Sequence, residues 1–324
     1  MKPIKFEFLL KPTIWAGEEI TKMKNIADKK GIGESWEISG VPGDETRVVE
    51  GDDLGATLPE LIEKYGAKFV GAKNLQQYGT TFPLLIKFIS AAEPLSIQVH
   101  PDDAMANRMG HPYGKTEMWY IVGSGEGANL CSGFAHDFSA EAYTNSLEDG
   151  SLEEHLAYHD TKAGDCFFIP AGRIHSIGAD NFLIEIQQSS NDTFRVYDFN
   201  RTDAQGNRRE LHVVQAQEAL DYKAYDEYRS HYTAEQNAAT LMVECPQFTT
   251  RLIKADQELV MNYADIDSFV ILIAYEGSAQ LTDSEGNTTT LAKGESILLP
   301  ACNEKLTITP VGGEQFSCVE TFVV

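Results

Sequence analysis

The sequence predicts a mainly β protein built from two β-barrels in tandem, with a few helices inserted between strands. The first observation is a series of short apolar runs, rich in Val, Ile, Leu and Phe, which glycine and proline residues separate. Short strands at such spacing are typical of antiparallel sandwiches and barrels. The runs lie at residues 82–89, 118–123, 165–170, 181–188, 268–275, 295–300 and 316–324.

The second observation is an internal repeat between two distant segments. Residues 164–175 read GDCFFIPAGRIH, and residues 294–305 read GESILLPACNEK. In both segments a glycine and an acidic residue precede an apolar run that ends in Pro-Ala, which indicates a duplicated barrel. The position of His175 is Lys305 in the second copy, and no histidine follows His231. A histidine-bound metal would therefore belong to the first barrel.

Helices are fewer than strands. The segments at residues 57–66 and 151–159 each begin with Ser or Thr followed by Glu three positions later, which is the pattern of a capping box. Residues 211–222 predict a third helix, and the polar stretch at residues 223–240 predicts a connection between domains.

The domain boundaries follow from this connection. We expect an N-terminal metal-binding barrel with inserted helices at residues 1–222 and a degenerate C-terminal barrel at residues 241–324.

Composition and charge narrow the class of protein. The chain has 324 residues and a formal net charge of -23, so we expect it to bind neither nucleic acid nor anionic membranes. The sequence has no apolar stretch of about 20 residues, the length that spans a membrane, and its first residues lack the apolar block of a signal peptide. The five cysteines form no CxxC pair, which favours free thiols in a reducing compartment. We therefore expect a cytoplasmic location.

Four polar side chains in strand-like segments form a candidate metal site. Gln98 and His100 are two residues apart, so a strand would point both side chains to the same face. Glu117 opens an apolar strand, where a buried carboxylate needs a partner, and His175 follows a Pro-Ala-Gly turn. A single histidine is more often a surface or core residue than a ligand. Two histidines, a carboxylate and an amide together suit zinc, although manganese or iron would accept the same ligand types.

These motifs carry a family resemblance that runs from about residue 10 to the end of the chain. The stretch from Gly164 to His175 resembles the second conserved motif of the cupin superfamily. The first cupin motif normally has His-x-His with a glutamate close behind it, whereas here Gln98-Val99-His100 replaces that pair and Glu117 lies further along. This departure resembles the type I phosphomannose isomerases in their short bacterial form. The segments that carry the resemblance are GESWEISG, FPLLIKFI, PLSIQVHPDD, GKTEMWYI, FIPAGRIHSIG and DTFRVYDFNR.

The resemblance implies a tandem cupin fold and a zinc-dependent enzyme that interconverts mannose 6-phosphate and fructose 6-phosphate. It implies one zinc ion per chain, a catalytic arginine and a pocket for a sugar phosphate. The implied zinc ligands are Gln98, His100, Glu117 and His175. Arg195 matches the catalytic arginine, and the other matching pocket positions are Lys87, Ser96, Lys115 and Glu185.

Two of these residues are candidates for proton transfer. An aldose–ketose isomerase moves a proton between adjacent carbons through an enediol, so it needs a base. Glu185 is a candidate carboxylate base, and an ion pair inside the barrel is the competing interpretation. Lys115 would share a strand face with Glu117, where it would act as an acid or base or neutralise that carboxylate.

Two other residues are candidates for binding charge. Arg195 would stabilise the enediolate or bind phosphate, unless it forms a surface salt bridge with Asp192 or Asp198. Lys87 interrupts an apolar strand, and with Ser96 we expect it to bind phosphate; the alternative is an edge-strand lysine whose ammonium lies in water.

Two other functions are weighed against the isomerase. A metal-dependent cupin dioxygenase would favour more histidine ligands than this chain offers. A non-catalytic sugar-binding protein with two cupin barrels would fit the degenerate second barrel, but not the intact set of polar residues in the first.

Overall fold

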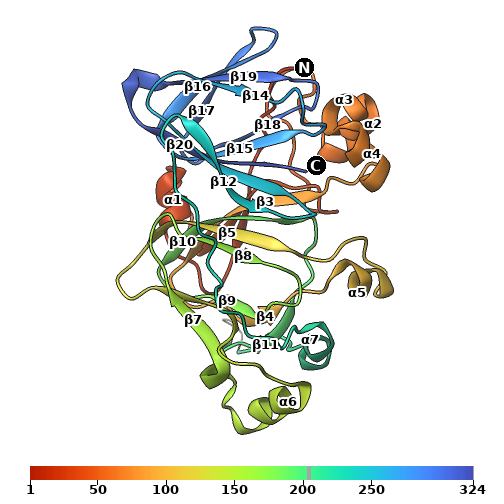
Figure 1. Ribbon diagram of the computed structural model, residues 1–324, viewed down its shortest axis with the longest axis vertical. Coiled ribbons are helices and arrows are strands. Elements are labelled where there is room, and N and C mark those ends of the chain that lie inside the picture. Colours follow the sequence, from red (N-terminus) through yellow and green to blue (C-terminus); the bar gives the residue numbers. More distant parts are fainter. Residues whose placement is uncertain (203–205, 324) are drawn as a thin grey trace. The chain divides into compact units, whose positions relative to one another are not determined.

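A computed structural model describes residues 1–202 and 206–323, and it is mainly β (Figure 1). The strands that precede residue 200 are β1 Leu9–Pro12, β2 Ile32–Ile38, β3 Leu84–Ala91, β4 Ile97–Val99, β5 Glu117–Ser124, β6 Asn129–Phe134, β7 Leu156–Asp160, β8 Cys166–Ile169, β9 His175–Ile177, β10 Asn181–Gln188 and β11 Phe194–Tyr197. The later strands are β12 Ala238–Glu244, β13 Thr249–Ala255, β14 Leu259–Asn262, β15 Val270–Glu276, β16 Ser278–Asp283, β17 Thr288–Ala292, β18 Ser296–Leu299, β19 Lys305–Pro310 and β20 Phe316–Phe322.

The helices are short. They are α1 Glu19–Met23, α2 Leu58–Tyr65, α3 Ala67–Val70, α4 Ala72–Tyr78, α5 Asp103–Arg108, α6 Ala140–Asp149 and α7 Val213–Ala219, with 3-10 turns at Leu152–His155 and Val311–Gly313. Within the described residues, no helix has the length and apolar character needed to cross a membrane.

The chain forms two compact units, which we describe separately. Unit 1 comprises Met1–Leu9, Trp36–Ile86 and His231–Val324, of which Val324 itself lies outside the described residues. Unit 2 comprises Leu10–Ser35 and Lys87–Ser230. The predicted domain boundaries near residues 222 and 241 stay a prediction.

Unit 2 contains two antiparallel sheets that enclose an apolar core. One sheet has the strand order β1-β2-β3-β10-β5-β8, and the other has the order β11-β4-β9-β6-β7. Trp119 of β5 and Leu183 of β10 pack in the same cluster as Leu130 of β6 and Ile177 of β9, so the core lies between the sheets. Because side chains alternate along each strand, the polar residues that share this inner face also point into the barrel.

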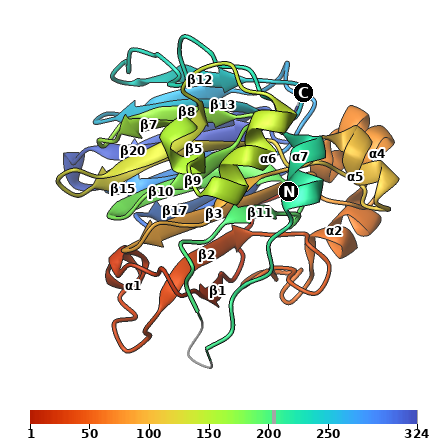
Figure 2. The same ribbon diagram turned by 90° about the horizontal axis from the view of Figure 1, so that it is seen from below.

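Two helices cover the outer face of the second sheet of unit 2. Tyr143 of α6 and Ala216 of α7 pack in one buried cluster with Val99 of β4 and Phe194 of β11. Figures 1 and 2 both show α6 and α7 beside this sheet. The sheet is therefore apolar on its outer face, which leaves its inner face free for polar side chains.

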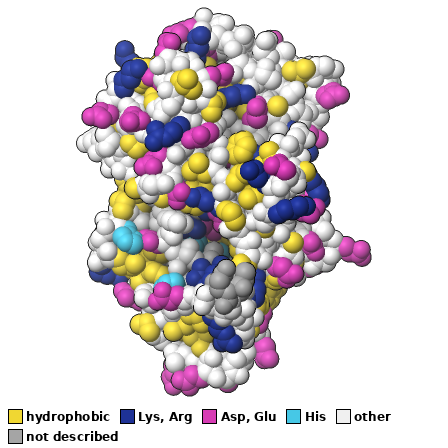
Figure 3. All heavy atoms as spheres, turned by 180° about the vertical axis from the view of Figure 1, so that it is seen from behind, with side chains coloured by type: hydrophobic (Ala, Val, Ile, Leu, Met, Phe, Trp, Pro, Cys, Tyr) yellow, Lys and Arg dark blue, Asp and Glu magenta, His cyan; other side chains and the backbone are white. Residues whose placement is uncertain are grey.

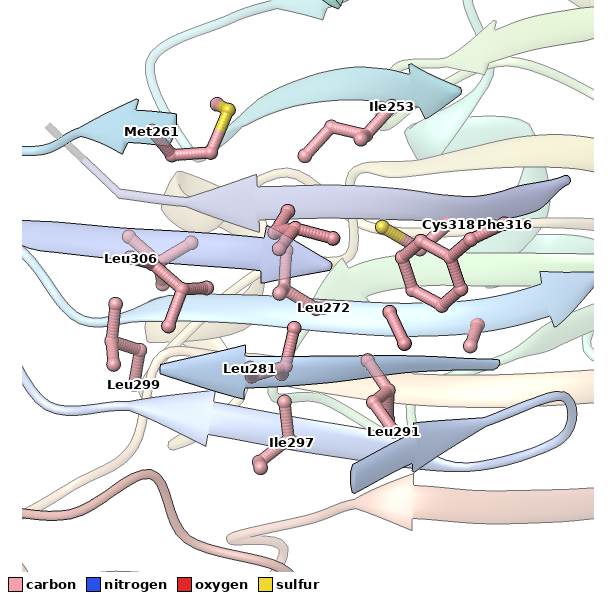
Figure 4. Packing of buried hydrophobic residues seen from close by; sticks show 14 of the residues in the cluster. Ile253, Met261, Leu272, Leu281, Leu291, Ile297, Leu299, Leu306, Phe316 and Cys318 are labelled. Carbon is pink, nitrogen blue, oxygen red and sulfur yellow. The ribbon is translucent and has the colours of Figure 1, made fainter. Parts of the chain in front are cut away.

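Unit 1 repeats this architecture with its own core. Its sheets have the strand orders β12-β13-β20-β15-β18 and β14-β19-β16-β17. Figure 4 shows Leu272 and Ile297 of one sheet facing Leu281 and Leu306 of the other. This face is mainly apolar, although the buried carboxylate of Glu320 also lies on it and contacts Tyr263 and Arg251.

The strand pairings confirm the duplicated barrel. In unit 2, β5 lies between β10 and β8, and Trp119 pairs with Glu185 on one side and Phe167 on the other. In unit 1, β15 lies between β20 and β18, and Leu272 pairs with Glu320 and Ile297 in the same way. The sequence repeat aligns residue 167 with residue 297, so the register of the repeat and the register of the sheets agree.

Two of the three predicted helices are confirmed, and one prediction is wrong. Helix α2 has the expected capping box, and α7 forms within the segment at residues 211–222. The segment at residues 151–159 instead forms one 3-10 turn and then β7, which pairs with β6. Ser151 has φ -91° and ψ 3° and makes no capping hydrogen bond, so pairing with the sheet overrides the local helix pattern.

Candidate active site

The four predicted metal ligands lie together inside the unit 2 barrel. Gln98 of β4 pairs in register with His175 of β9, and His100 follows Gln98 on the same face. Glu117 begins β5 in the facing sheet, and its two carboxylate oxygens lie 3.4 Å from Nε2 of His100 and 3.4 Å from Nε2 of His175. Within the part of the chain that the structure describes, these three residues form the one group of His, Cys, Asp or Glu side chains suited to a metal ion.

The hydrogen bonds of the two histidines determine which ring nitrogen is free. Nδ1 of His100 lies 2.8 Å from the carbonyl oxygen of Asp192, and Nδ1 of His175 lies 2.8 Å from that of Arg173. A carbonyl oxygen only accepts, so each Nδ1 carries the proton and each Nε2 presents a lone pair towards Glu117. Burial and then the charge of Lys115 lower the pKa of His100 to about 3, and burial lowers the pKa of His175. Both rings are therefore neutral, as metal ligands must be.

The Glu117 carboxylate is fully buried. Neither of its oxygens has a hydrogen-bond donor among the described residues, although Nζ of Lys115 lies 3.3 Å from one of them. Burial would raise the pKa of Glu117, but opposing influences, of which the charge of Lys115 is the largest, hold the pKa well below the usual range. A buried anion with two unbonded oxygens, opposite two nitrogen lone pairs, is the arrangement that a divalent cation would satisfy.

Gln98 completes the donor set by residue type. Its side-chain Nε2 lies 3.2 Å from Nε2 of His175, and its Oε1 lies 3.4 Å from the hydroxyl of Ser96. The oxygen and nitrogen of an amide are nearly the same shape, so exchanging them would turn the oxygen towards the cluster. The residues present therefore fit a divalent metal with nitrogen and oxygen ligands.

A cavity of about 330 Å³ opens beside this cluster. Gln98 and Lys115 are part of its wall, and the other predicted pocket residues Lys87, Ser96, Glu185 and Arg195 also line it. Further lining residues are Trp15, Glu34, Ile89, Leu95, Ile177, Asn191, Thr193, Arg209 and His212. Figure 3 shows a hollow in which basic, acidic and histidine side chains lie close together.

Lys87 and Glu185 form a buried ion pair at one end of the cavity. Lys87 lies on β3, which has β2 on one side and β10 on the other, so the edge-strand alternative does not hold. Its Nζ lies 2.9 Å from Oε1 of Glu185 and 3.6 Å from Glu34, and these carboxylates outweigh burial and raise the pKa of Lys87. The indole N–H of Trp119 donates to Oε2 of Glu185 at 2.9 Å, so one carboxylate oxygen is hydrogen-bonded and the other lies against the ammonium of Lys87. Glu185 therefore does form the ion pair inside the barrel that was the alternative to its role as a base.

Arg195 on β11 lies next to the candidate metal site. It pairs in register with Gln98, and its Nη1 donates to the carbonyl oxygen of Glu210 at 2.9 Å. Neither predicted salt bridge forms, because Asp198 binds Arg201 and Arg209 instead, with oxygen–nitrogen distances of 2.6 and 2.7 Å. Nε of Arg195 has no hydrogen-bond partner among the described residues. Arg195 also lines the cavity, so its guanidinium can contact a ligand there.

The sequence reasoning missed two contributors to this site. Trp119 packs in the core between the sheets, and its indole also donates a hydrogen bond to Glu185. Its place two residues after Glu117 puts it on the same strand face, which was the available signal. Arg209 lies outside the named strands, and only the fold brings it to the cavity.

The second barrel lacks this ligand set at the equivalent positions. The repeat and the strand pairings place Asn262 at the position of Gln98, Val270 at that of Glu117 and Lys305 at that of His175. An ion pair between the partly buried Arg251 on β13 and the buried Glu320 on β20 does remain, like the pair of Lys87 on β3 and Glu185 on β10 in unit 2. The absence of a histidine at these equivalent positions agrees with the expectation that a histidine-bound metal belongs to the first barrel.

Comparison with known proteins gives a consistent result. A sequence model described as the catalytic domain of type I phosphomannose isomerase matches residues 14–122. Mannose-6-phosphate isomerase ManA of Bacillus subtilis is 31% identical over 302 residues, which cover 92% of this chain and 93% of the relative. Mannose-6-phosphate isomerase of Streptococcus mutans is 31% identical over 301 residues, which cover 92% of each chain.

The structural comparison extends over the whole chain. The crystal structure of mannose 6-phosphate isomerase from Bacillus subtilis superimposes with a TM-score of 0.89 at 29% identity and covers 100% of both chains. A putative mannosephosphate isomerase from Archaeoglobus fulgidus, at 22% identity and a TM-score of 0.79, shares the fold. The predicted tandem cupin fold is confirmed. The chain therefore belongs to the type I phosphomannose isomerase family and is an aldose–ketose isomerase.

Proposed function

We propose that the chain interconverts D-mannose 6-phosphate and D-fructose 6-phosphate through an enediol, with one zinc ion bound by Gln98, His100, Glu117 and His175. The observation that carries this proposal is the buried cluster in which two imidazole lone pairs face an unbonded carboxylate. The cluster lies beside a cavity lined by cationic and anionic side chains. The names of the relatives support the proposed substrate, and the donor atoms of the cluster support the proposed metal.

Zinc is the proposed metal because two nitrogen and two oxygen ligands suit it and leave open positions. Bound there, the ion would polarise the carbonyl group of the sugar and stabilise negative charge on its oxygen. Metal analysis of the purified protein distinguishes zinc from manganese and iron.

Two side chains are proposed to move the proton. Glu185 faces the cavity, and its contacts with Lys87 and Trp119 fix the carboxylate in position. Burial and the charge of Glu117 raise the pKa of Glu185, which favours proton transfer near neutral pH. Nζ of Lys115 lies 3.1 Å from Nε2 of His100, at the wall nearest the metal cluster. We assign abstraction of the carbon-bound proton to Glu185 and proton exchange at the sugar oxygens to Lys115.

Arg195 is proposed to stabilise the enediolate. Its register with Gln98 puts the guanidinium beside a metal ligand, and its Nε is unbonded. A fixed cation at the point where negative charge develops lowers the barrier more than it strengthens substrate binding.

The two ends of the cavity differ in charge, and this difference indicates where the phosphate group of the substrate would bind. At the Lys87 end, one ammonium faces the carboxylates of Glu185 and Glu34. On the side that we call the arginine end, Arg195 and Arg209 line the cavity. The carboxylate of Asp198 binds Arg209 and Arg201, whereas Arg195 donates to the carbonyl oxygen of Glu210.

We propose that Lys87 and Ser96 bind the substrate, as the sequence predicts. Because the arginine end carries more positive charge, we propose that the phosphate dianion binds there.

The test is turnover of mannose 6-phosphate by the purified protein, with fructose 6-phosphate converted to glucose 6-phosphate and detected by its dehydrogenase. We expect activity that a chelator abolishes and that one equivalent of zinc restores. A zinc-bound protein that does not turn over mannose 6-phosphate would contradict the proposed substrate. A metal-free protein that does turn it over would contradict the proposed role of zinc. A cytoplasmic location stays a prediction.

A further inference from the structure

The turn that carries His175 is enclosed by a later segment of unit 2. Backbone hydrogen bonds join Asp221 N–H to the carbonyl oxygen of Gly172 at 2.8 Å and Gly172 N–H to that of His100 at 2.9 Å. A side chain at Gly172, whose φ is +86°, would place its Cβ 3.0 Å from the carbonyl oxygen of Ala219. The segment and the turn are thus in close backbone contact.

Arg173 is the side chain that joins this segment to the turn. Its guanidinium carbon lies 4.8 Å from the centre of the Tyr225 ring and 4.7 Å from the centre of the Tyr228 ring. The two rings lie at 77° to each other with their centres 6.0 Å apart, so the guanidinium fits into the corner that they form. It gains cation–π attraction from both rings.

Tyr228 is itself held in position. Its hydroxyl donates to the carbonyl oxygen of Phe134 at 2.8 Å and accepts from Tyr225 N–H at 3.0 Å. Gly133 leaves the space for the ring, since a Cβ there would lie 2.2 Å from it. The buried Tyr228 ring therefore gives Arg173 a rigid surface to pack against.

We propose that the segment Ala219–Ser230 is a strap that positions His175, with Arg173 as the positioning residue. Nδ1–H of His175 donates to the carbonyl oxygen of Arg173 at 2.8 Å, so holding Arg173 fixes the direction in which Nε2 points. The inference rests on the proposed metal site and adds a role for a side chain that touches neither metal nor substrate. Removing a group that orients a ligating imidazole in this way commonly weakens metal binding by about 10- to 100-fold.

The test compares zinc affinity among variants, measured by competition with a chelator of known affinity. Arg173→Ala should bind zinc about tenfold or more weakly, by analogy with other groups that orient a metal ligand. Arg173→Lys, which keeps a cation near the two rings but loses the planar guanidinium, should bind zinc more tightly than Arg173→Ala and less tightly than the wild type. Tyr225→Leu removes one ring at a half-exposed site and should weaken zinc binding without preventing folding.

Arg229→Ala is the matched control on the same strap. Arg229 also lies over an aromatic ring, that of Phe167, and it contacts Asp160 and Asp165, but none of these residues belongs to the turn. We expect this variant to lose stability in denaturant titration while its zinc affinity stays within twofold of the wild type.

Three results would contradict the proposal, and they differ in what they overturn. Equal zinc affinity in Arg173→Ala and the wild type would remove the positioning role and leave the metal site intact. An equal loss in Arg229→Ala would show that general destabilisation, and not orientation of His175, weakens binding. A wild-type chain with no measurable zinc affinity would overturn the metal site and the strap together.

Discussion

The indole N–H of Trp119 donates to the carboxylate of Glu185 across neighbouring strands, with a nitrogen–oxygen distance of 2.9 Å. The same two residues pair in register, so the sheet itself sets the contact. Lys87 holds the other carboxylate oxygen, and the proposed base therefore has one defined orientation in the cavity.

Replacing Trp119 by Phe should slow turnover and leave metal binding intact. The substitution removes a hydrogen bond to a charged group, which contributes about 1.5–3 kcal/mol, so we expect kcat to fall about 10- to 100-fold. Steady-state kinetics and metal analysis check this expectation. Trp36→Phe is the control, because Trp36 is a buried indole of unit 1. Unchanged kcat in Trp119→Phe would show that Glu185 needs no second donor.

Replacing His175 by Ala should abolish both bound zinc and activity, because one of two nitrogen ligands is lost. His159→Ala is the matched control: its ring is half-buried in the same unit, and its Nε2 contacts the carbonyl oxygen of Ser132. Metal content after dialysis and the coupled turnover assay measure the two effects. Full turnover with retained zinc in His175→Ala would contradict the assigned ligand set.

Replacing Arg195 by Ala should reduce kcat by about two orders of magnitude or more while zinc stays bound. Arg195 is not a ligand, so metal content is the control within the same sample. Arg195→Lys should recover part of kcat, because it keeps the charge but loses the guanidinium geometry. If KM alone rises, Arg195 binds substrate and does not stabilise the transition state.

Replacing Arg209 by Ala should raise KM for the sugar phosphate and weaken inhibition by inorganic phosphate. Its guanidinium lines the cavity and is held by Asp198 at 2.7 Å, where it adds positive charge to the arginine end. The exposed Lys162 of the same unit provides a control of equal charge change, Lys162→Ala. If Lys87→Ala weakened phosphate inhibition and Arg209→Ala did not, the phosphate would belong at the Lys87 end.

The metal-free protein should lose stability as the pH falls from about 7 towards 4. The pKa of His100 drops to about 3 on folding, from about 6.5 in an unfolded chain, so the unfolded state binds more protons between these values. The contribution is fully present above the unfolded pKa and declines by about 1.4 kcal/mol per pH unit below it. The lowered pKa values of His175 and Glu117 act in the same direction.

Denaturant titration at several pH values measures this slope. In His100→Asn, which has no titrating ring, the slope of unfolding free energy against pH should be smaller by the amount that one bound proton contributes, about 1.4 kcal/mol per pH unit. An unchanged slope in that variant would show that His100 does not titrate on unfolding in this range.

The fold was predictable because its main features are local in the sequence. The apolar runs correspond to strands, and the repeat at residues 164–175 and 294–305 records the duplication. The segment at residues 151–159 was mispredicted because its helix pattern is local, whereas pairing of β7 with β6 depends on residues brought together by folding.

The site was predictable where strand alternation applies and unpredictable where it does not. Gln98 and His100 share a face by spacing alone. Glu117 was a candidate because it opens an apolar strand, and His175 because it follows a Pro-Ala-Gly turn. The bond between Asp198 and Arg209 and the packing of Arg173 against Tyr225 join residues that lie far apart in the sequence or outside regular elements. No periodic pattern records such contacts, so they emerged only from the fold.

The most direct test of the account is diffraction from crystals of the purified protein, measured on both sides of the zinc absorption edge. The account predicts one anomalous peak in unit 2, at about 2.0–2.2 Å from Nε2 of His100, Nε2 of His175 and an oxygen of Glu117, with Gln98 as the fourth protein ligand. An active protein whose crystals show no metal among these side chains would contradict it.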